Sequence, residues 1–223
     1  MGLKVRCVAL LGGSFDPVHQ GHIAIATLFS ELLQADELRI IPAGQPWQKS
    51  RLQATPADRI QMLRLAFGET TLPVRIDCQE IERDGMTYSI DTLRAIRAEL
   101  GDETSIVFLL GADQLQHLDT WRAWRNLFDY AHICVAARPG FSLQDSTAST
   151  TVMQEFLQRA ATLAEIRNTP HGLTYLAPDL ALDISATEIR QALQKSNAPG
   201  ALVPMLLPKV VLDYIQQHHL YKS

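Results

Sequence analysis

The stretch LLGGSFDPVHQGHIAIATLF, residues 10–29, decides how the chain begins to fold. An apolar run over residues 5–11 has the length and continuity of a strand buried on both faces, and apolar residues recur at helical spacing over residues 23–33. Between them lie Gly12 and Gly13, which let a ligand approach the backbone, and a helix start, whose free N–H groups favour an anion. We therefore predict a strand, a turn and a helix that form an anion site.

Two histidines, His19 and His22, stand three residues apart at the foot of this helix. One interpretation is a tight turn with two half-exposed histidines, and another is a zinc site. Zinc-binding histidines on a helix are usually four residues apart and need a third ligand, and this window offers no obvious one. We favour a phosphate-binding role for the pair.

Composition and charge exclude several classes of protein. The 223 residues are 47% hydrophobic and 20% charged, which is typical of a soluble globular protein with a core. The net charge of -4 argues against nucleic-acid or membrane-surface partners, and no stretch reaches the roughly 18 apolar residues of a membrane span. Cys7, Cys78 and Cys134 lack C-x-x-C spacing, so we expect free core thiols and a cytoplasmic location.

Strand-like and helix-like patterns alternate along the rest of the chain. This alternation predicts an α/β fold, a Rossmann-like, doubly wound, mostly parallel sheet with helices on both faces. We expect a single domain over residues 1–223, with a helical C-terminal portion from about 185 to 223. Further strands are expected at residues 38–42, 74–78, 105–110, 133–137 and 174–177, and further helices from residue 55 and at 88–100, 121–128, 153–164, 185–195 and 208–218.

The carboxyl ends of parallel strands share one edge of a sheet, where ligands of such folds bind. In this chain that edge brings together the glycine turn at residues 12–13, the loop at 42–49, residues 111–113 and Arg138. These segments are far apart in the sequence, and their convergence predicts the location of the site.

A second candidate segment is ISATEIR, residues 184–190, at the start of the penultimate predicted helix. Ser185 and Glu188 have the spacing of a capping box, which accounts for that pair on structural grounds alone. Thr187 and Arg190 are not explained by capping. They lie in the first turn and a half of the helix, where a hydroxyl, N–H groups and a guanidinium can converge on a phosphate.

Together, residues 12–22 (GGSFDPVHQGH) and 184–190 resemble the signature pair of the nucleotidylyltransferase superfamily. The segment TYSIDTL at 87–93, the GAD at 111–113 with Trp121, the RPG at 138–140 and the end of the chain from Leu207 to Tyr221 make it similar to bacterial nicotinate-nucleotide adenylyltransferases. The resemblance spans nearly the whole chain. One departure is Ala186, where the family more often has serine.

The resemblance implies transfer of the adenylyl group of ATP to nicotinate mononucleotide, with release of pyrophosphate, in NAD biosynthesis. His19, His22 and Arg190 would be catalytic, with His22 nearest the transferring phosphate and Arg190 on the β and γ phosphates together with Ser185. Asp113 would accept a hydrogen bond from a ribose hydroxyl of ATP. The residues implied to bind ATP are Gly12, Gly13, Ser14, Phe15, Gly111, Asp113, Arg138, Ile184, Ser185 and Thr187.

On the acceptor side, Lys49 would hold the phosphate of the mononucleotide, and Trp121 would stack on its pyridine ring. Backbone N–H groups near Thr87 and Tyr88 would bind the pyridine carboxylate. Core packing is the alternative for Trp121, since Trp124 and Phe128 lie close by in the sequence, and a solvated loop is the alternative for Lys49.

The resemblance also implies Mg²⁺, held mainly by the phosphates of ATP and by water, with no protein ligand assigned. ATP and nicotinate mononucleotide are the expected partners, and a homo-oligomer is possible. Two rival functions stay open at this point. One is transfer to nicotinamide mononucleotide or another phosphorylated acceptor, and the other is a nucleotide sensor without turnover.

Overall fold

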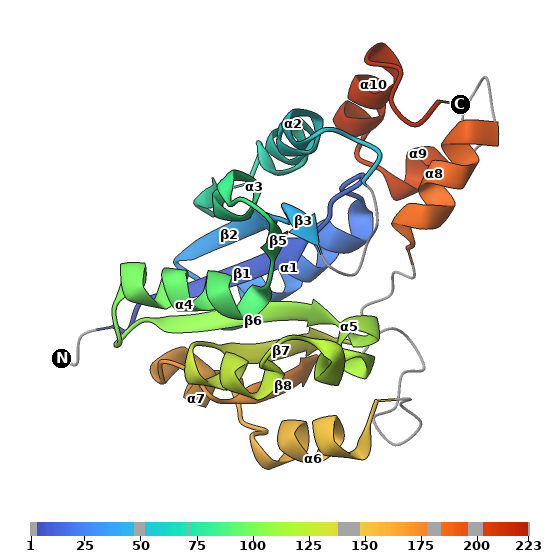
Figure 1. Ribbon diagram of the computed structural model, residues 1–223. Coiled ribbons are helices and arrows are strands. Elements are labelled where there is room, and N and C mark those ends of the chain that lie inside the picture. Colours follow the sequence, from blue (N-terminus) through green and yellow to red (C-terminus); the bar gives the residue numbers. More distant parts are fainter. Residues whose placement is uncertain are drawn as a thin grey trace.

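A computed structural model of the chain describes residues 4–46, 52–70, 72–137, 148–177, 184–195 and 203–222. Within them, one parallel sheet has six strands: β1 (Cys7–Gly13), β2 (Glu37–Pro42), β4 (Val74–Ile76), β6 (Ser105–Gly111), β7 (His132–Ala136) and β8 (Thr174–Ala177). Their order across the sheet is β4-β2-β1-β6-β7-β8 (Figure 1). The chain therefore starts in the middle, builds one half of the sheet, and returns to build the other, so the direction of winding changes between β1 and β6.

Helices cover both faces of this sheet, which confirms the predicted doubly wound α/β fold (Figure 1). In the described parts of the chain, no helix is both long and apolar enough to cross a membrane. The α-helices are α1 (Gln20–Leu33), α2 (Pro56–Phe67), α3 (Gln79–Glu82), α4 (Ser89–Leu100), α5 (Ala112–Gln116), α6 (Thr150–Gln158), α7 (Leu163–Asn168), α8 (Ala186–Lys195), α9 (Val203–Leu206) and α10 (Lys209–Gln217). Two 3₁₀ helices are η1 (Leu118–Thr120) and η2 (Trp124–Asp129).

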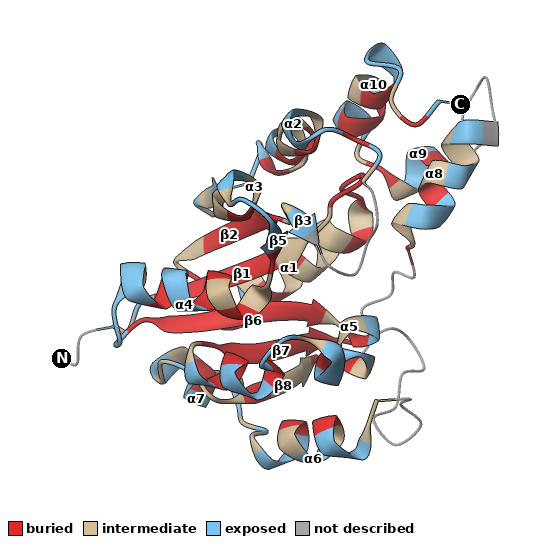
Figure 2. Cartoon of the chain, in the orientation of Figure 1, coloured by how far each residue is buried: buried red, intermediate tan, exposed pale blue. Residues whose placement is uncertain are grey.

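The central strands are apolar without alternation because both of their faces are covered (Figure 2). Cys7, Ala9 and Leu11 of β1 belong to one buried cluster, which also contains residues of α1, α2 and α10. Val8 and Leu10 belong to the other cluster, with residues of α4, η2 and α6. Alternate side chains of β1 therefore pack into two different cores, one on each face of the sheet.

A second, small sheet joins β3 (Gln45–Pro46) to β5 (Met86–Thr87) in parallel. It lies beyond the carboxyl end of β2, where the backbone N–H of Ala43 donates to the carbonyl of Gly13 at 2.8 Å. This pairing brings Thr87 to the same edge as the glycine turn, although more than seventy residues separate them. The sequence patterns did not predict it, since each strand has only two residues.

The structure corrects three of the predictions from sequence. The expected helix at 153–164 is two helices, because a bridge pairs Ala160 with Thr174 and a capping box of Thr162 with Glu165 begins α7. The expected helix at 121–128 is a 3₁₀ helix that follows Ala123, whose φ is 50°. Cys78 is half-buried at the start of α3 rather than a core thiol.

Buried polar side chains hold the amino end of the sheet. The guanidinium of Arg97 donates hydrogen bonds to the carbonyls of Gly101, Thr104, Tyr130 and Pro170, at distances from 2.7 to 3.2 Å. It therefore binds carbonyl groups from three separate loops at this end of the sheet.

The imidazole of His132, in β7, is fully buried. The backbone N–H of Leu173 donates to its Nδ1 at 3.0 Å, so Nε2 carries the proton and donates to the carbonyl of Thr169 at 2.8 Å. Burial lowers the pKa of His132 to about 4, and the ring is neutral in the folded protein at pH 7.

Candidate active site

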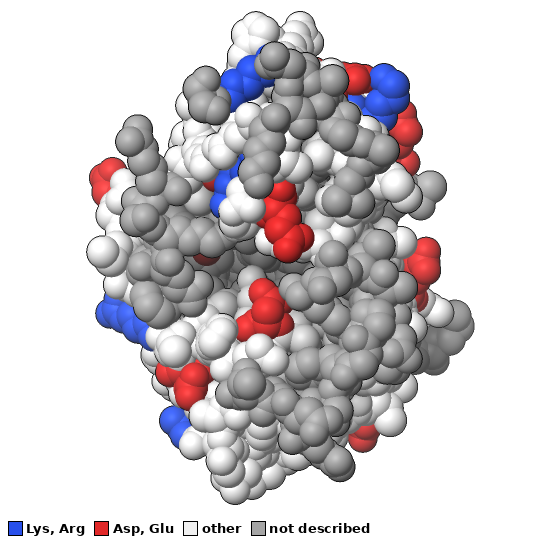
Figure 3. All heavy atoms as spheres, turned by 90° about the vertical axis from the view of Figure 1, so that its right-hand side faces the viewer, with Lys and Arg blue, Asp and Glu red and all other residues white. Residues whose placement is uncertain are grey.

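Two adjoining pockets open at the carboxyl ends of β1, β2 and β6, on a face that is hollowed near its centre (Figure 3). They share Gly12, Gly13, Ser14 and Gln114. We name them the histidine pocket and the tryptophan pocket. The histidine pocket is also lined by Leu11, His19, Gly21, His22, Ile25, Gly111, Ala112, Asp113, Ala136, Ala137, Ile184, Ser185, Ala186 and Thr187. The tryptophan pocket is also lined by Ile41, Ala43, Glu80, Thr87, Ser89, Thr92, Leu93, Phe108 and Trp121.

The two imidazoles lie at the start of α1, stacked with their ring centroids 3.7 Å apart. His19 is the N-cap residue, in extended conformation, and its backbone N–H donates to Nδ1 of His22 at 3.3 Å. The pair forms a reciprocal capping box in which histidines replace the usual hydroxyl and carboxyl side chains. The ring of Phe15 meets His22 edge-on, with centroids 4.8 Å apart. The helix start itself therefore fixes both rings beside the pocket.

Two glycines are closely packed where the two pockets meet. A Cβ on Gly12 would lie 3.3 Å from the ring of Phe108, and one on Gly13 would lie 3.1 Å from the ring of Phe15. Phe15 is fully buried at a φ of 47°, so it supports the turn from behind. This packing leaves the backbone of the turn bare toward the pocket.

The second candidate segment reaches the same pocket as the histidines. Ile184, Ser185 and Thr187 line it, as does Ala186, although more than 160 residues separate them from the glycine turn. Asp113 lines the same pocket, and its Oδ1 lies 2.6 Å from the position that a Cβ on Gly111 would take. The prediction that the two signature segments share one pocket thus agrees with the geometry.

Arg190 takes a different direction from the one expected. Its Nη1 donates to the carbonyl of Asp16 at 2.6 Å, and its Nη2 donates to Oγ1 of Thr187 at 3.1 Å. In this structure the guanidinium therefore joins α8 to the loop between β1 and α1.

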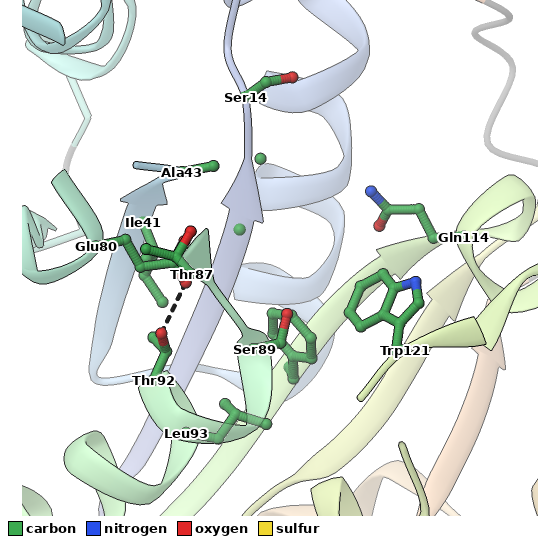
Figure 4. A pocket seen from close by; sticks show the side chains of 13 residues that line it. Ser14, Ile41, Ala43, Glu80, Thr87, Ser89, Thr92, Leu93, Gln114 and Trp121 are labelled. Atoms are coloured by element: carbon green, nitrogen blue, oxygen red, sulfur yellow. Dashed lines mark hydrogen bonds between the residues drawn. The ribbon is translucent and has the colours of Figure 1, made fainter. Parts of the chain in front are cut away.

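The tryptophan pocket has an aromatic wall and a polar wall (Figure 4). The indole of Trp121 is partly exposed at the pocket and meets Phe108 edge-on at 6.2 Å, whereas Trp124 is buried in the core. Trp121 is thus exposed to a ligand in the way that the stacking role requires.

The polar wall contains a buried carboxyl group. Glu80 accepts a hydrogen bond from the Thr92 hydroxyl at 2.7 Å (Figure 4) and one from the backbone N–H of Gly44. Burial raises the pKa of Glu80. A Cβ on Gly44 would lie 2.0 Å from the carbonyl oxygen of Glu80, so only glycine allows this contact. The wall is therefore packed against the end of β2 with little room to shift.

The segment at residues 87–89 was expected to bind the pyridine carboxylate, and its side chains point in different directions. Thr87 and Ser89 line the tryptophan pocket, while the ring of Tyr88 lies beneath the guanidinium of Arg122, 4.8 Å from centroid to Cζ. Lys49 and Arg138 lie outside the described residues.

Several lining residues had not been identified from the sequence. Gln114 belongs to α5, a five-residue helix with no clear periodic pattern. Glu80 belongs to the four-residue α3, and an isolated glutamate gives no sequence signal. Ala43 lies in the loop at 42–49, which was predicted to reach this edge, but it was not singled out as a site residue. In the tryptophan pocket, the others in this group are Ile41, Ser89, Thr92, Leu93 and Phe108.

A buried network lies behind the histidine pocket. The carboxylate of Asp16 accepts hydrogen bonds from the backbone N–H groups of Gln53 and Ala54, at 2.8 and 3.0 Å, and from the hydroxyl of Tyr221, at 2.8 Å. Arg59, which is 1% exposed, donates to the carbonyl of Ser14 at 2.9 Å. The turn that carries the glycines and histidines is therefore fixed from α2 and from the end of the chain.

Comparison with known proteins agrees with this geometry. Residues 10–192 match the model of the cytidylyltransferase-like family. A protein of Herminiimonas arsenicoxydans described as a probable nicotinate-nucleotide adenylyltransferase is 61% identical, over 98% of both chains. A protein of the same description from Laribacter hongkongensis is 42% identical, over 97% of this chain and 94% of its own.

Solved structures share the fold. The nicotinic acid mononucleotide adenylyltransferase of Plasmodium falciparum, complexed with NaAD, is 20% identical, with a TM-score of 0.74 over 97% of both chains. The same enzyme complexed with APC gives a TM-score of 0.70 at 18% identity over 97% of both chains.

Proposed function

The chain belongs to the nicotinate-nucleotide adenylyltransferases, which transfer the adenylyl group of ATP to nicotinate mononucleotide in NAD biosynthesis, and from this premise we propose how its residues divide the work. ATP occupies the histidine pocket, and the mononucleotide occupies the tryptophan pocket. The observation that carries the proposal is the wall of Gly12, Gly13 and Ser14 that the two pockets share. Two substrates on either side of that wall would meet at the bare backbone of the turn.

The histidine pocket suits a triphosphate. Two imidazoles, the start of α1 and the hydroxyls of Ser185 and Thr187 surround it, and all of these groups can donate hydrogen bonds to phosphate oxygens. Asp113 would accept a hydroxyl of the adenosine ribose. We place His22 nearest the transferring phosphate and keep Arg190 as a ligand of the β and γ phosphates, which would require its side chain to leave Asp16.

The tryptophan pocket suits the acceptor. Trp121 offers an aromatic face to the pyridine ring, and the backbone at Thr87 and Tyr88 would donate to the nicotinate carboxylate, with charge-assisted bonds contributing about 1.5 to 3 kcal/mol each. We keep Lys49 as the ligand of the acceptor phosphate.

In the proposed reaction, a phosphate oxygen of nicotinate mononucleotide attacks the α-phosphorus of ATP in line with the leaving group. A P–O bond forms to the acceptor, the bond between the α-phosphorus and the bridging oxygen breaks, and pyrophosphate leaves. The attacking oxygen is already anionic, so no protein nucleophile is needed. Catalysis then consists of positioning two anions and stabilising charge on the transferring group, which is the work of fixed hydrogen-bond donors such as His22.

We also propose that the reaction uses Mg²⁺ carried mainly by the phosphates of ATP. In the part of the chain that is described, no group of three or more His, Cys, Asp and Glu side chains gathers to hold an ion. The pocket offers imidazoles, hydroxyls and the single carboxylate of Asp113, which fits an ion coordinated largely by phosphate and water. Such an ion would neutralise charge on the leaving pyrophosphate. A cytoplasmic location and a homo-oligomeric state stay predictions.

The proposal is tested by measuring pyrophosphate release from ATP with one acceptor at a time. We expect nicotinate mononucleotide to react with a higher kcat/KM than nicotinamide mononucleotide or phosphopantetheine. Preference for another acceptor would contradict the assignment of the tryptophan pocket. Binding of ATP without release of pyrophosphate from it in the presence of any acceptor would instead indicate a sensor.

A further inference from the structure

The hydroxyl of Tyr221, which follows α10, contacts the loop between β1 and α1, the segment that carries Ser14, Asp16 and His19. It donates to Oδ1 of Asp16 at 2.8 Å, and the two residues are 205 positions apart. Tyr221 is 7% exposed and Asp16 is 3% exposed, so water cannot readily replace this bond. Burial also raises the pKa of Tyr221, which keeps the hydroxyl protonated and able to donate.

The backbone after α10 turns back on itself to make this contact. His219 and Tyr221 both adopt the left-handed region, with φ of 53° and 61°, and the N–H of Leu220 donates to the carbonyl of Ile215 at 3.0 Å. Left-handed conformations cost a non-glycine residue free energy, so they persist where the surroundings determine them. The bond from Leu220 to Ile215 is that of a helix C-terminal cap, which accommodates His219, and Tyr221 follows with its hydroxyl on Asp16.

Asp16 lies between the groups that the reaction needs. Ser14, two residues before it, lines both pockets, and His19, three residues after it, is the N-cap of α1 and stacks on His22. The side chain of Asp16 is bound by Tyr221 and by the backbone of Gln53 and Ala54. A change in the position of Asp16 would therefore be transmitted to both ends of the turn.

Building on the function proposed above, we propose that Tyr221 is a positioning residue for adenylyl transfer, holding Asp16 so that Ser14 and the two imidazoles keep their reactive placement. The hydroxyl contacts no substrate in this arrangement. Misplacement of catalytic groups by about 1 Å can cost about a hundredfold in rate. Loss of the hydroxyl should accordingly lower kcat more than it changes either KM.

The test compares Tyr221→Phe with Tyr214→Phe. Tyr214 is a matched control, because its hydroxyl also ties the C-terminal segment to a carboxylate, that of Asp58 on α2, at 2.9 Å, but does not contact the loop. We expect kcat to fall about tenfold or more in Tyr221→Phe and to stay within about twofold of the wild type in Tyr214→Phe. Both are assayed at a temperature where circular dichroism shows each variant to be folded.

Equal kcat values for the two variants, or an unchanged kcat in Tyr221→Phe, would show that Tyr221 only helps to anchor the last helix and would overturn the proposal. The ring ¹⁵N resonances of His19 and His22 provide a second readout. They should shift in Tyr221→Phe and not in Tyr214→Phe.

Asp16→Asn weakens the same hydrogen bond by changing the acceptor instead of the donor. This variant supplies the test if Tyr221→Phe does not fold. It should reproduce the loss of kcat, and a normal kcat in this variant contradicts the proposal. The outcome is separable from that of the proposed function, which depends on the acceptor preference of the unmodified protein.

Discussion

The stacked imidazoles are informative at the scale of single residues. Two rings with centroids 3.7 Å apart repel one another when both are cationic, and a polyphosphate beside them offsets that repulsion. A core role is less compatible with the geometry, since His22 is half-buried and both rings line a pocket. The pair is better placed to bind an anion than to fill space.

Replacing His22 with alanine should lower kcat by about a hundredfold or more, because it removes a fixed donor from the site where charge develops. Steady-state pyrophosphate release measures the change, and circular dichroism checks the fold. Ser30→Ala, on the same helix but away from both pockets, is the control and should retain the wild-type rate. Near-normal turnover in His22→Ala would remove this residue from the chemistry.

Trp121→Ala should raise KM for nicotinate mononucleotide by about tenfold or more and leave KM for ATP nearly unchanged. The reason is that the indole lines only the pocket assigned to the acceptor. Trp121→Phe keeps an aromatic face and should recover much of the affinity. If both substrates were affected equally, the stacking role would be refuted.

At this scale the sequence predicted which segments meet at the site. It predicted the directions of individual side chains less well. The glycines, both histidines, Asp113 and Trp121 line the pockets as expected. Arg190 lies on the expected helix, but it binds a carbonyl of the loop. Spacing along a helix assigns a residue to a face and leaves its rotamer open.

At the scale of elements, all six strands of the main sheet were predicted. The signal was clearest in β1 and β6, which are nearly continuous apolar runs because both of their faces are covered, and weaker in the edge strands β4 and β8, which are only partly buried. The two-residue strands β3 and β5 and the short helices α3 and α5 are too brief to show a period. The break between α6 and α7 was missed although Thr162 and Glu165 have capping-box spacing. Apolar periodicity continued across it and masked the signal.

The buried His132 of β7 should make the free energy of unfolding depend on pH. His132 has a pKa of about 4 in the folded protein, below the value of about 6.5 of an unfolded histidine. The unfolded chain therefore takes up a proton first as pH falls, so this stabilisation is complete above about pH 6.5 and is lost progressively toward pH 4. We expect a decrease in the free energy of unfolding of about 3 kcal/mol over this window, measured by urea denaturation.

His132→Gln should reduce the slope in that window, and His117→Gln, at an exposed histidine, should retain it. Glu99 contributes only at the lower edge of the window, because hydrogen bonds from Arg39 and Arg75 hold its pKa at about 2 and its contribution is lost between about pH 4.5 and pH 2. A slope that persists unchanged in His132→Gln would assign the acid sensitivity to another group.

At the scale of the whole molecule, the C-terminal helices share a core with the first strand. Val211 and Ile215 of α10 belong to the same buried cluster as Phe15, Val18 and the residues of α2. The hydroxyl of Tyr214 adds a bond to Asp58 of α2. This continuity supports the prediction of one domain over residues 1–223.

A single domain should unfold in one transition. Guanidinium unfolding followed by tryptophan fluorescence and by far-ultraviolet circular dichroism should give coincident midpoints, and hydrogen exchange should find α10 and β1 opening together. If α8 to α10 exchanged at much lower denaturant than the sheet, the C-terminal portion would count as a separate unit.

The bond between Asp16 and Tyr221 also has a consequence for biosynthesis. A ribosome delivers Asp16 205 positions before its partner, so a growing polypeptide holds that carboxylate without its phenol until residue 221 has been added. Fragments that stop before residue 221 lack the hydrogen bond from Tyr221 to Asp16. If Tyr221 positions the loop as proposed, catalytic competence follows only after residue 221 has been made and has folded onto Asp16.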